Sequence, residues 1–172
     1  LFRLFFLDVK KCDSPNVIIV SSASPLPIWK AYFWAKRFNA KLIFEVRDIW
    51  PLSIMELGGF KKTNPFVVLL QITENFAYKV SDYVVSVLPK AFEHMKHHGL
   101  DLPRFKYIPN GIEIKNLINT DEVNKDVFKI GYAGTLGIAN ALKYLIYAAH
   151  LIKESKIEIH LLGNGPEKEN LM

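Results

Sequence analysis

Cysteine and long apolar runs are scarce in this chain of 172 residues. Cys12 is the only cysteine, which excludes a disulfide framework and a zinc site built from several cysteines. No apolar run reaches the roughly 18 residues that a membrane-spanning helix needs. The apolar stretch 1–7 is short and lacks a signal-type cleavage pattern. We therefore expect a protein of the reducing cytoplasm.

Two familiar nucleotide-binding motifs are also missing. The turn at 131–137 reads Gly-Tyr-Ala-Gly-Thr-Leu-Gly, without the Gly-x-Gly pair of a dinucleotide fingerprint or the Gly-Lys-Ser/Thr of a Walker loop. This turn still places backbone N–H groups between a strand and a helix N-terminus, where phosphate is favoured. A second turn at 163–166, Gly-Asn-Gly-Pro, could bring backbone against a nucleotide in the same way. Both turns could equally be plain strand-to-helix connections that bind no phosphate.

The composition is that of an ordinary globular protein with a basic surplus. Half of the residues (50%) are hydrophobic, 23% are charged, and the formal net charge is +5. The surplus favours anionic partners such as nucleotides, phosphates or an acidic membrane surface. Nucleic acid is not expected as a partner, because the Lys and Arg residues are scattered and no recognition motif is present.

Short apolar runs alternate with helical patterns along the chain. Strands are predicted at 17–20, 41–47, 83–87, 105–108, 128–132 and 157–162, and helices at 1–11, 28–38, 65–80, 89–98 and 139–153. A helix between consecutive strands requires parallel pairing, so the predicted fold class is α/β. The polar, irregular stretch 113–126 is expected to link two such parts.

Three charged residues stand at the end of the second predicted strand. Glu45, Arg47 and Asp48 precede a Trp-Pro pair. In open α/β sheets, ligands bind just beyond the carboxyl ends of the strands, so these residues mark a candidate site. A structural ion pair closing the strand is the alternative. The small-residue loop 21–27, Ser-Ser-Ala-Ser-Pro-Leu-Pro, follows the first strand as either a ligand-contacting loop or a plain turn.

Three histidines near the end of the helix 89–98 raise the question of a metal site. No carboxylate or cysteine clusters with His94 and His97 in the sequence to complete a ligand set. Cationic histidines beside the helix C-terminus, where the helix dipole favours positive charge, explain His94, His97 and His98 more simply. We therefore expect no metal here.

The helix 65–80 is unusually apolar. Its predicted buried face is formed by Phe66, Leu69, Leu70, Phe76, Ala77 and Val80. Val67 and Val68 extend the apolar surface beyond that face. With Phe60, Lys61 and Lys62 they could contact a membrane interface, although burial within the domain is the preferred interpretation.

Several motifs occur in an order that resembles the family 4 glycosyltransferases. These are the strand end Ile-Pro-Asn-Gly-Ile-Glu at 108–113, then Tyr-Ala-Gly-Thr-Leu-Gly at 132–137 and Leu-Leu-Gly-Asn-Gly-Pro-Glu at 161–167. Phe-Glu-Val-Arg-Asp-Ile-Trp-Pro at 44–51 and the loop 21–27 are similar to one branch, the bacterial transferases that build O-antigen, capsule and exopolysaccharide. The resemblance implies a retaining, nucleotide-sugar-dependent hexosyltransferase of the GT-B fold.

In that fold two Rossmann-like domains face each other across a cleft. The resemblance implies that residues 1–109 are the later part of the acceptor-side domain. Residues 110–127 would be the interdomain linker, and 128–172 the start of the nucleotide-sugar-binding domain.

The resemblance also implies roles for individual residues. Arg47 and Asp48 would act in catalysis with Glu45 as their support, and Ser22 and Ser24 would lie on the acceptor-side loop. The implied donor-binding residues are Gly134, Thr135, Leu136, Gly137, Asn140, Gly163, Asn164 and Gly165.

The sequence departs from the family in several places. After Gly137 the branch usually has a basic residue and then Ala-Gln-Gly, whereas this chain has Ile-Ala-Asn-Ala at 138–141. A charge that could steady the diphosphate is therefore missing, and Asn140 can offer only hydrogen bonds. The family's first strand with its glycine loop, its later basic residues and its Glu-x7-Glu motif have no counterpart. We expect a fragment that is inactive by itself.

The resulting hypothesis is transfer of a sugar from a UDP- or GDP-linked donor to a lipid-linked glycan acceptor in cell-surface polysaccharide synthesis. The nucleotide sugar is a substrate, and no cofactor or metal is expected. The expected location is the cytoplasm, with peripheral contact at the anionic cytoplasmic face of the inner membrane. Two alternatives stay open: a non-catalytic nucleotide- or lipid-binding module, and an enzyme that modifies sugar nucleotides, against which the missing dinucleotide fingerprint argues.

Overall fold

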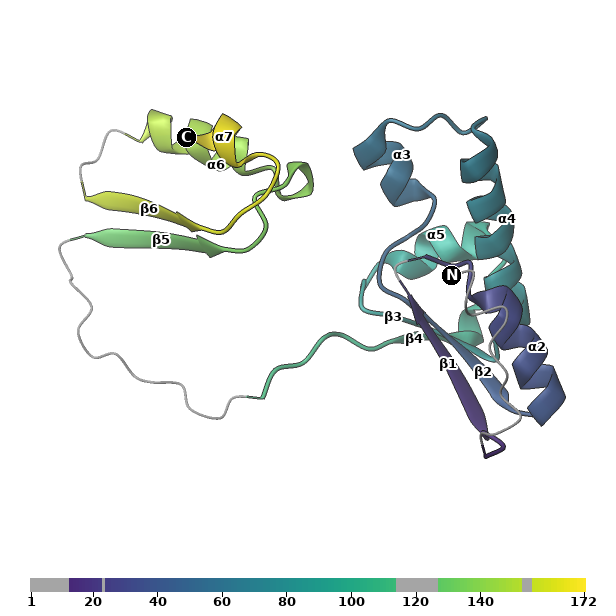
Figure 1. Cartoon of the computed structure of the whole chain (residues 1–172). Coiled ribbons are helices and arrows are strands. Elements are labelled where there is room, and N and C mark those ends of the chain that lie inside the picture. Colours follow the sequence, from purple (N-terminus) through teal and green to yellow (C-terminus); the bar gives the residue numbers. More distant parts are fainter. Residues whose placement is uncertain (1–12, 23, 114–126, 153–155) are drawn as a thin grey trace. The chain divides into compact units, whose positions relative to one another are not determined.

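The structure is a computed structural model that describes residues 13–22, 24–113, 127–152 and 156–172 (Figure 1). The chain divides into two compact units, unit 1 at Leu1–Ile112 and unit 2 at Glu113–Met172. The helix predicted at 1–11 and most of the predicted linker lie outside the described residues. In the described ranges, no helix combines the length and the apolar character needed to cross a membrane.

Unit 1 is built on a parallel sheet whose strand order follows the chain order. Its strands are β1 (Val17–Ser22), β2 (Lys41–Val46), β3 (Tyr83–Ser86) and β4 (Phe105–Tyr107). The connections contain α2 (Ile28–Phe38), α3 (Leu52–Gly58), α4 (Pro65–Val80), α5 (Ala91–His97) and a 3₁₀ turn at Leu102–Arg104. Every strand pair is parallel, as the predicted crossovers require.

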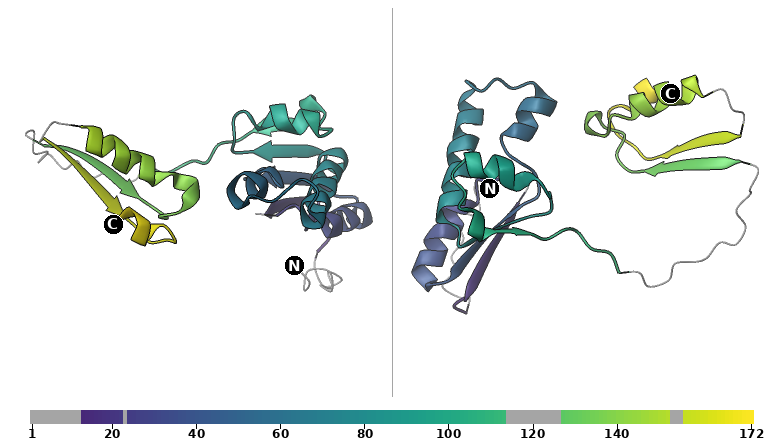
Figure 2. Two further views of the ribbon diagram at one scale, coloured as in Figure 1. Left: turned by 90° about the horizontal axis from the view of Figure 1, so that it is seen from above. Right: turned by 180° about the vertical axis from the view of Figure 1, so that it is seen from behind.

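The core of unit 1 lies between the sheet and the helices α2, α4 and α5. The helices α2 and α4 lie side by side (Figure 2). Alternate residues of β2, namely Leu42, Phe44 and Val46, are buried, since successive side chains of a strand point to opposite faces. Trp29 of α2 stacks on Phe76 of α4 with ring centroids 3.9 Å apart. Trp29 therefore packs within the unit.

The ends of α4 follow from its sequence. The Asn64 side chain accepts a hydrogen bond from the Phe66 N–H at 2.9 Å, and Pro65 occupies the first helical position. The predicted buried face of this helix is wrong in part. Phe66 and Leu69 are each 47% exposed. The buried residues are Val67, Leu70, Thr73, Glu74, Ala77 and Tyr78.

Two polar residues lie on the buried side of α4, and their hydrogen bonds account for the difference between the predicted and the observed buried face. Thr73 Oγ1 accepts a hydrogen bond from Trp29 Nε1 at 3.1 Å, and Glu74 Oε1 accepts one from the Tyr78 hydroxyl at 2.7 Å. Because these polar groups have partners inside the protein, their burial is tolerated. The helix therefore turns Thr73 and Glu74 inward and leaves large apolar side chains outside.

Unit 2 contains the parallel strands β5 (Phe128–Ala133) and β6 (Ile157–Leu162). A 3₁₀ turn at Ile138–Asn140 and α6 (Leu142–Leu151) connect them, and α7 (Lys168–Leu171) follows β6. The predicted helix 139–153 begins later than expected because Ala141 adopts a left-handed conformation with φ of 52°. Leu136 and Leu142 are the buried residues of this unit in its described part.

Candidate functional site

The carboxyl ends of β1, β2 and β3 lie side by side at one end of the unit 1 sheet, here called the carboxyl edge. Val46, the last residue of β2, is opposite Ser22 on one side and Ser86 on the other. The fully buried Ser86 donates a hydrogen bond to the Val46 carbonyl at 2.9 Å and accepts one from the Leu88 N–H at 3.1 Å. These bonds fix where β2 and β3 end, and so fix the start of the loop that carries Arg47 and Asp48.

Arg47 and Asp48 directly follow β2, and both are exposed at this edge. Glu45 is half-buried within the sheet. In the described part of the chain, no hydrogen bond or ion pair joins these three side chains, so neither the structural ion pair nor the expected support by Glu45 is observed. Arg47 and Asp48 are therefore available to a ligand.

The two serines of the acceptor-side loop begin at the same edge. Ser22 ends β1 opposite Val46. Ser24 is half-buried, and its hydroxyl lies 3.5 Å from the Leu26 N–H that donates to it. The sheet register thus brings Ser22 close in space to the start of the Arg47 loop, although 24 positions separate it from Val46 in the chain.

A small cavity of about 10 Å³ lies behind this edge. Asp48 and Trp50 line it together with Glu74 and Tyr78 of α4. The Trp50 Nε1 group is buried and has no hydrogen-bond partner among the described residues. The cavity therefore links the loop that carries Asp48 to the buried Glu74 carboxylate. The sequence did not point to Glu74, because a charged residue in a helix is usually assumed to face solvent.

In unit 2, backbone hydrogen bonds join the two glycine-containing turns that follow β5 and β6. The Gly134 N–H donates to the Leu162 carbonyl at 2.9 Å, and the Leu136 N–H donates to the Asn164 carbonyl at 2.9 Å. The Glu167 N–H donates in turn to the Leu136 carbonyl at 3.0 Å. Backbone hydrogen bonds therefore hold the two predicted donor-binding turns, 134–137 and 163–165, side by side.

Glycine is required where these turns touch. A Cβ atom at Gly163 would overlap the carbonyl oxygen of Gly134, and one at Gly165 would overlap that of Leu136. Gly131, inside β5, is a contrast, since a Cβ there would meet nothing within 4 Å. The close approach explains why the second turn reads Gly-Asn-Gly.

Side-chain hydrogen bonds also stabilise the first of these turns, residues 134–137. The Thr135 carbonyl accepts hydrogen bonds from the Tyr132 hydroxyl at 2.7 Å and from Asn140 Nδ2 at 2.6 Å. The Asn140 amide thus holds the loop, and Tyr132, which the sequence analysis did not single out, has the same role. Among the described residues, the N–H groups of Thr135 and Gly137 donate to no acceptor. Two unpaired amides on a glycine turn are groups that bind phosphate oxygens.

The expectation that no carboxylate accompanies the histidines of α5 is wrong. Glu74 of α4 approaches His94, and His98 completes the group, whereas His97 lies outside it. Glu74 precedes His94 by 20 residues, so only the packing of α4 against α5 creates this cluster.

No family model matches the sequence, and no curated protein matches it. Solved structures do match. Anabaena Alr3699/HepE in complex with UDP-glucose is 16% identical with a TM-score of 0.60, over 87% of this chain and 40% of that one. The complex of the same protein with UDP has a TM-score of 0.64 at 16% identity, over 88% and 41%. A TarM mutant from S. aureus in complex with Fondaparinux, alpha-GlcNAc-glycerol and UDP is 17% identical with a TM-score of 0.62, over 98% and 32%.

The chain therefore spans less than half the length of the proteins it matches. At such low identity the likeness shows the fold alone. It confirms the predicted fold class: the chain has an α/β, GT-B-type fold with Rossmann-like units.

Proposed function

We propose that this chain supplies parts of a retaining, family 4 type glycosyltransferase that uses a nucleotide-sugar donor. The observation that carries the proposal is the joined pair of glycine turns in unit 2, with the unpaired Thr135 and Gly137 N–H groups facing no protein acceptor among the described residues. A diphosphate needs such donors because its oxygens carry negative charge. Structures with the same fold contain UDP or UDP-glucose, which favours uridine as the first base to test.

In this proposal the two units have different roles. The turns of unit 2 bind the donor diphosphate through backbone amides. Arg47 and Asp48 of unit 1, at the carboxyl edge of its sheet, act on the sugar and the acceptor, with Ser22 and Ser24 on the acceptor side. Positioning and electrostatic stabilisation of the departing diphosphate supply the catalysis, so the reaction requires no cofactor or metal ion. The acceptor is a lipid-linked glycan of cell-surface polysaccharide synthesis.

Donor binding is tested by following the backbone amide signals of the chain by NMR during titration with UDP, GDP and inorganic phosphate. We expect UDP to shift the signals of Thr135 and Gly137 at lower concentration than phosphate does, because the base and ribose add contacts. Signals that move with neither nucleotide would contradict the donor site. Nucleotide binding without sugar transfer, in the longest chain that contains this sequence, would favour a non-catalytic binding module.

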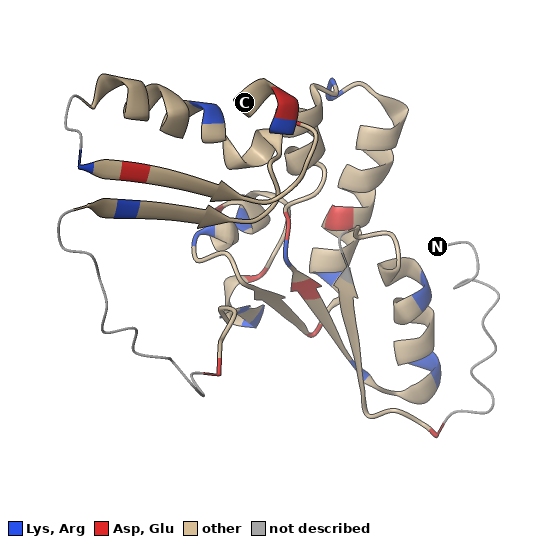
Figure 3. Ribbon diagram, turned by 60° about the vertical axis from the view of Figure 1, so that its left-hand side comes forward, with Lys and Arg blue, Asp and Glu red and all other residues tan. Residues whose placement is uncertain are grey.

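A membrane-contacting surface on unit 1 fits the proposed lipid-linked acceptor. Along α4 the side chains of Phe66, Leu69 and Ile72 are about half exposed, at 47%, 47% and 53%. The helix carries charge only at Glu74 and Lys79, and most of its ribbon is uncharged in Figure 3. Lys61 and Lys62 stand just before it and are exposed. Apolar side chains beside lysines are what an anionic bilayer surface binds.

We expect the double substitution Leu69→Asp and Ile72→Asp to lower the affinity for vesicles of phosphatidylcholine and phosphatidylglycerol, measured by cosedimentation, by about tenfold or more. Burying two such side chains contributes roughly 1.5–3 kcal/mol each when they leave water completely. The matched control is Leu102→Asp, since Leu102 is also exposed, at 41%, on unit 1. Equal binding by both variants would exclude this surface as the membrane contact.

A further inference from the structure

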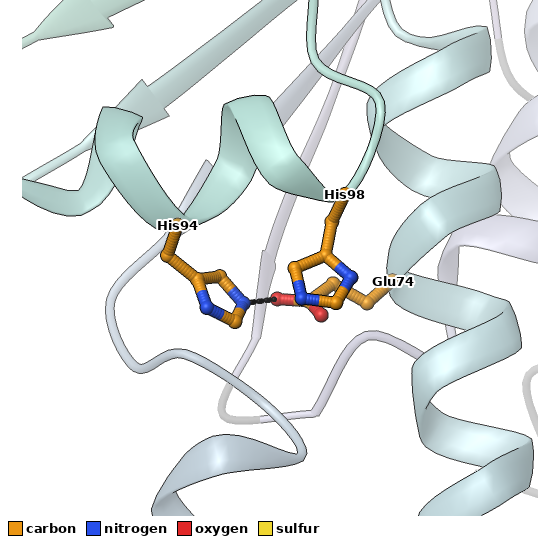
Figure 4. Close-up of side chains that lie close together, drawn as sticks. All are labelled: Glu74, His94 and His98. Carbon is orange, nitrogen blue, oxygen red and sulfur yellow. Dashed lines mark hydrogen bonds and ion pairs between the residues drawn. The ribbon is translucent and has the colours of Figure 1, made fainter.

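Three side chains from two helices converge on one point in unit 1. Glu74 comes from the middle of α4 and His94 from α5, and His98 directly follows the last residue of α5 (Figure 4). One ligand atom from each lies within 4.8 Å of those of the other two. His94 and His98 are four positions apart and therefore share one side of the helix. His94 Nε2 lies 3.2 Å from Glu74 Oε1.

The carboxylate at the centre is held in place. Glu74 is only 2% exposed. The Tyr78 hydroxyl donates to Oε1 at 2.7 Å, and Gln71 Nε2 donates to Oε2 at 2.7 Å. Groups that bind a metal are oriented by hydrogen bonds of this kind from behind. No Lys or Arg forms an ion pair with Glu74 in the part of the chain that the structure describes, so no permanent cation balances its charge.

We propose that Glu74, His94 and His98 bind a divalent transition-metal ion, for which zinc is the best match. Two imidazole nitrogens and one carboxylate oxygen form a known zinc ligand set, which leaves the fourth position open. Tetrahedral ligands with bonds of about 2.0 Å are separated by about 3.3 Å. The 3.2 Å between His94 Nε2 and Glu74 Oε1 fits this geometry, and the three ligand atoms all lie within 4.8 Å of one another.

A pocket beside the cluster offers room for the fourth ligand. Its volume is about 450 Å³, and His94 and His98 line it together with apolar residues such as Leu52, Met55 and Val67. The exposed Lys62 lines it as well. Water or a small anion could occupy the open coordination position from this pocket. Because its ligands come from both helices, the ion would tie α5 to α4. Its ligands belong to unit 1, whereas the proposed donor turns belong to unit 2.

The test is titration of the chelator-treated chain with zinc ions alone, in competition with a colorimetric indicator. We expect one ion per chain, with affinity reduced at least tenfold by His94→Gln and by His98→Gln, because each removes one ligand. The matched control is His97→Gln, which changes an exposed neighbour in the same helix and should leave the affinity unchanged. Zinc should also raise the thermal unfolding temperature of the wild type and of the control, but not of the two ligand variants.

Two results would overturn the proposal. One is equal zinc affinity in the wild type and in the double variant His94→Gln, His98→Gln, which would assign the binding to other histidines. The other is a loss of affinity in His97→Gln as large as in the ligand variants. Glu74 is not substituted, because removing the charge of a buried, hydrogen-bonded side chain also changes the stability of unit 1. The histidine variants alone therefore decide the outcome.

Discussion

Replacing Arg47 by alanine is expected to lower sugar transfer by about 100-fold or more while leaving folding intact. Removing one group that stabilises charge in a transition state costs about 10²–10³ in rate. Arg47 is exposed and has no hydrogen-bond or ion-pair partner within the described residues, so the fold does not depend on its guanidinium. The measurement is transfer by the longest chain that contains this sequence, accompanied by an unfolding curve.

The control for Arg47 is Arg37→Ala. Arg37 is also exposed, lies in the last turn of α2, and stands away from the carboxyl edge of the sheet. Its replacement should leave transfer unchanged. Wild-type turnover in Arg47→Ala would remove Arg47 from the catalytic proposal. Equal losses in the two variants would indicate a general effect of basic charge rather than a specific role.

The second large effect is expected from Gly163→Ala. The added Cβ atom would overlap the Gly134 carbonyl, and because that atom belongs to the backbone, one whole turn has to move. Forcing an extra carbon into a packed position costs about 1–3 kcal/mol. We expect faster amide hydrogen exchange at Gly134 and Leu136, whose hydrogen bonds join the two turns, and loss of the UDP-induced shifts at Thr135 and Gly137.

Gly131→Ala provides the matched comparison for this substitution. It adds the same methyl group to the same unit, at a position where nothing lies within 4 Å. Donor-induced shifts and hydrogen exchange should stay close to those of the wild type. If Gly163→Ala also retained the UDP response, the close contact of the turns would not matter for donor binding.

Local signals in the sequence predicted much of this fold. The bounds of α2 and α4, Ile28–Phe38 and Pro65–Val80, agree with the prediction, because caps and prolines act within a few residues of the helix ends. The alternation of strands and helices also predicted the parallel pairing, because a helix between two strands lets both run in the same direction. The break at Ala141 was not predicted, since an alanine carries no sequence signal for a left-handed conformation.

The parts that could not be predicted depend on contacts between distant residues. The face that α4 buries is determined by Thr73 and Glu74, whose polar groups find partners on α2 and within α4 itself. The group of Glu74, His94 and His98 exists only because α4 and α5 pack together. In unit 2, the sequence indicated two separate turns, whereas their mutual hydrogen bonds arise from the pairing of β5 with β6. The roles proposed for Arg47 and Asp48 remain predictions.

The hydrogen bonds of Leu136 to both sides of the second turn also limit how this protein can diverge. The Leu136 N–H donates to the Asn164 carbonyl, and the Leu136 carbonyl accepts from the Glu167 N–H. Inserting or deleting a residue in either turn would therefore shift these donors and acceptors out of register. Changes of loop length at this position would therefore break hydrogen bonds of both turns. If unit 2 binds the proposed donor, a change of donor preference would have to come from side chains that border the turns, such as those of Thr135 and Asn164, with the backbone path unchanged.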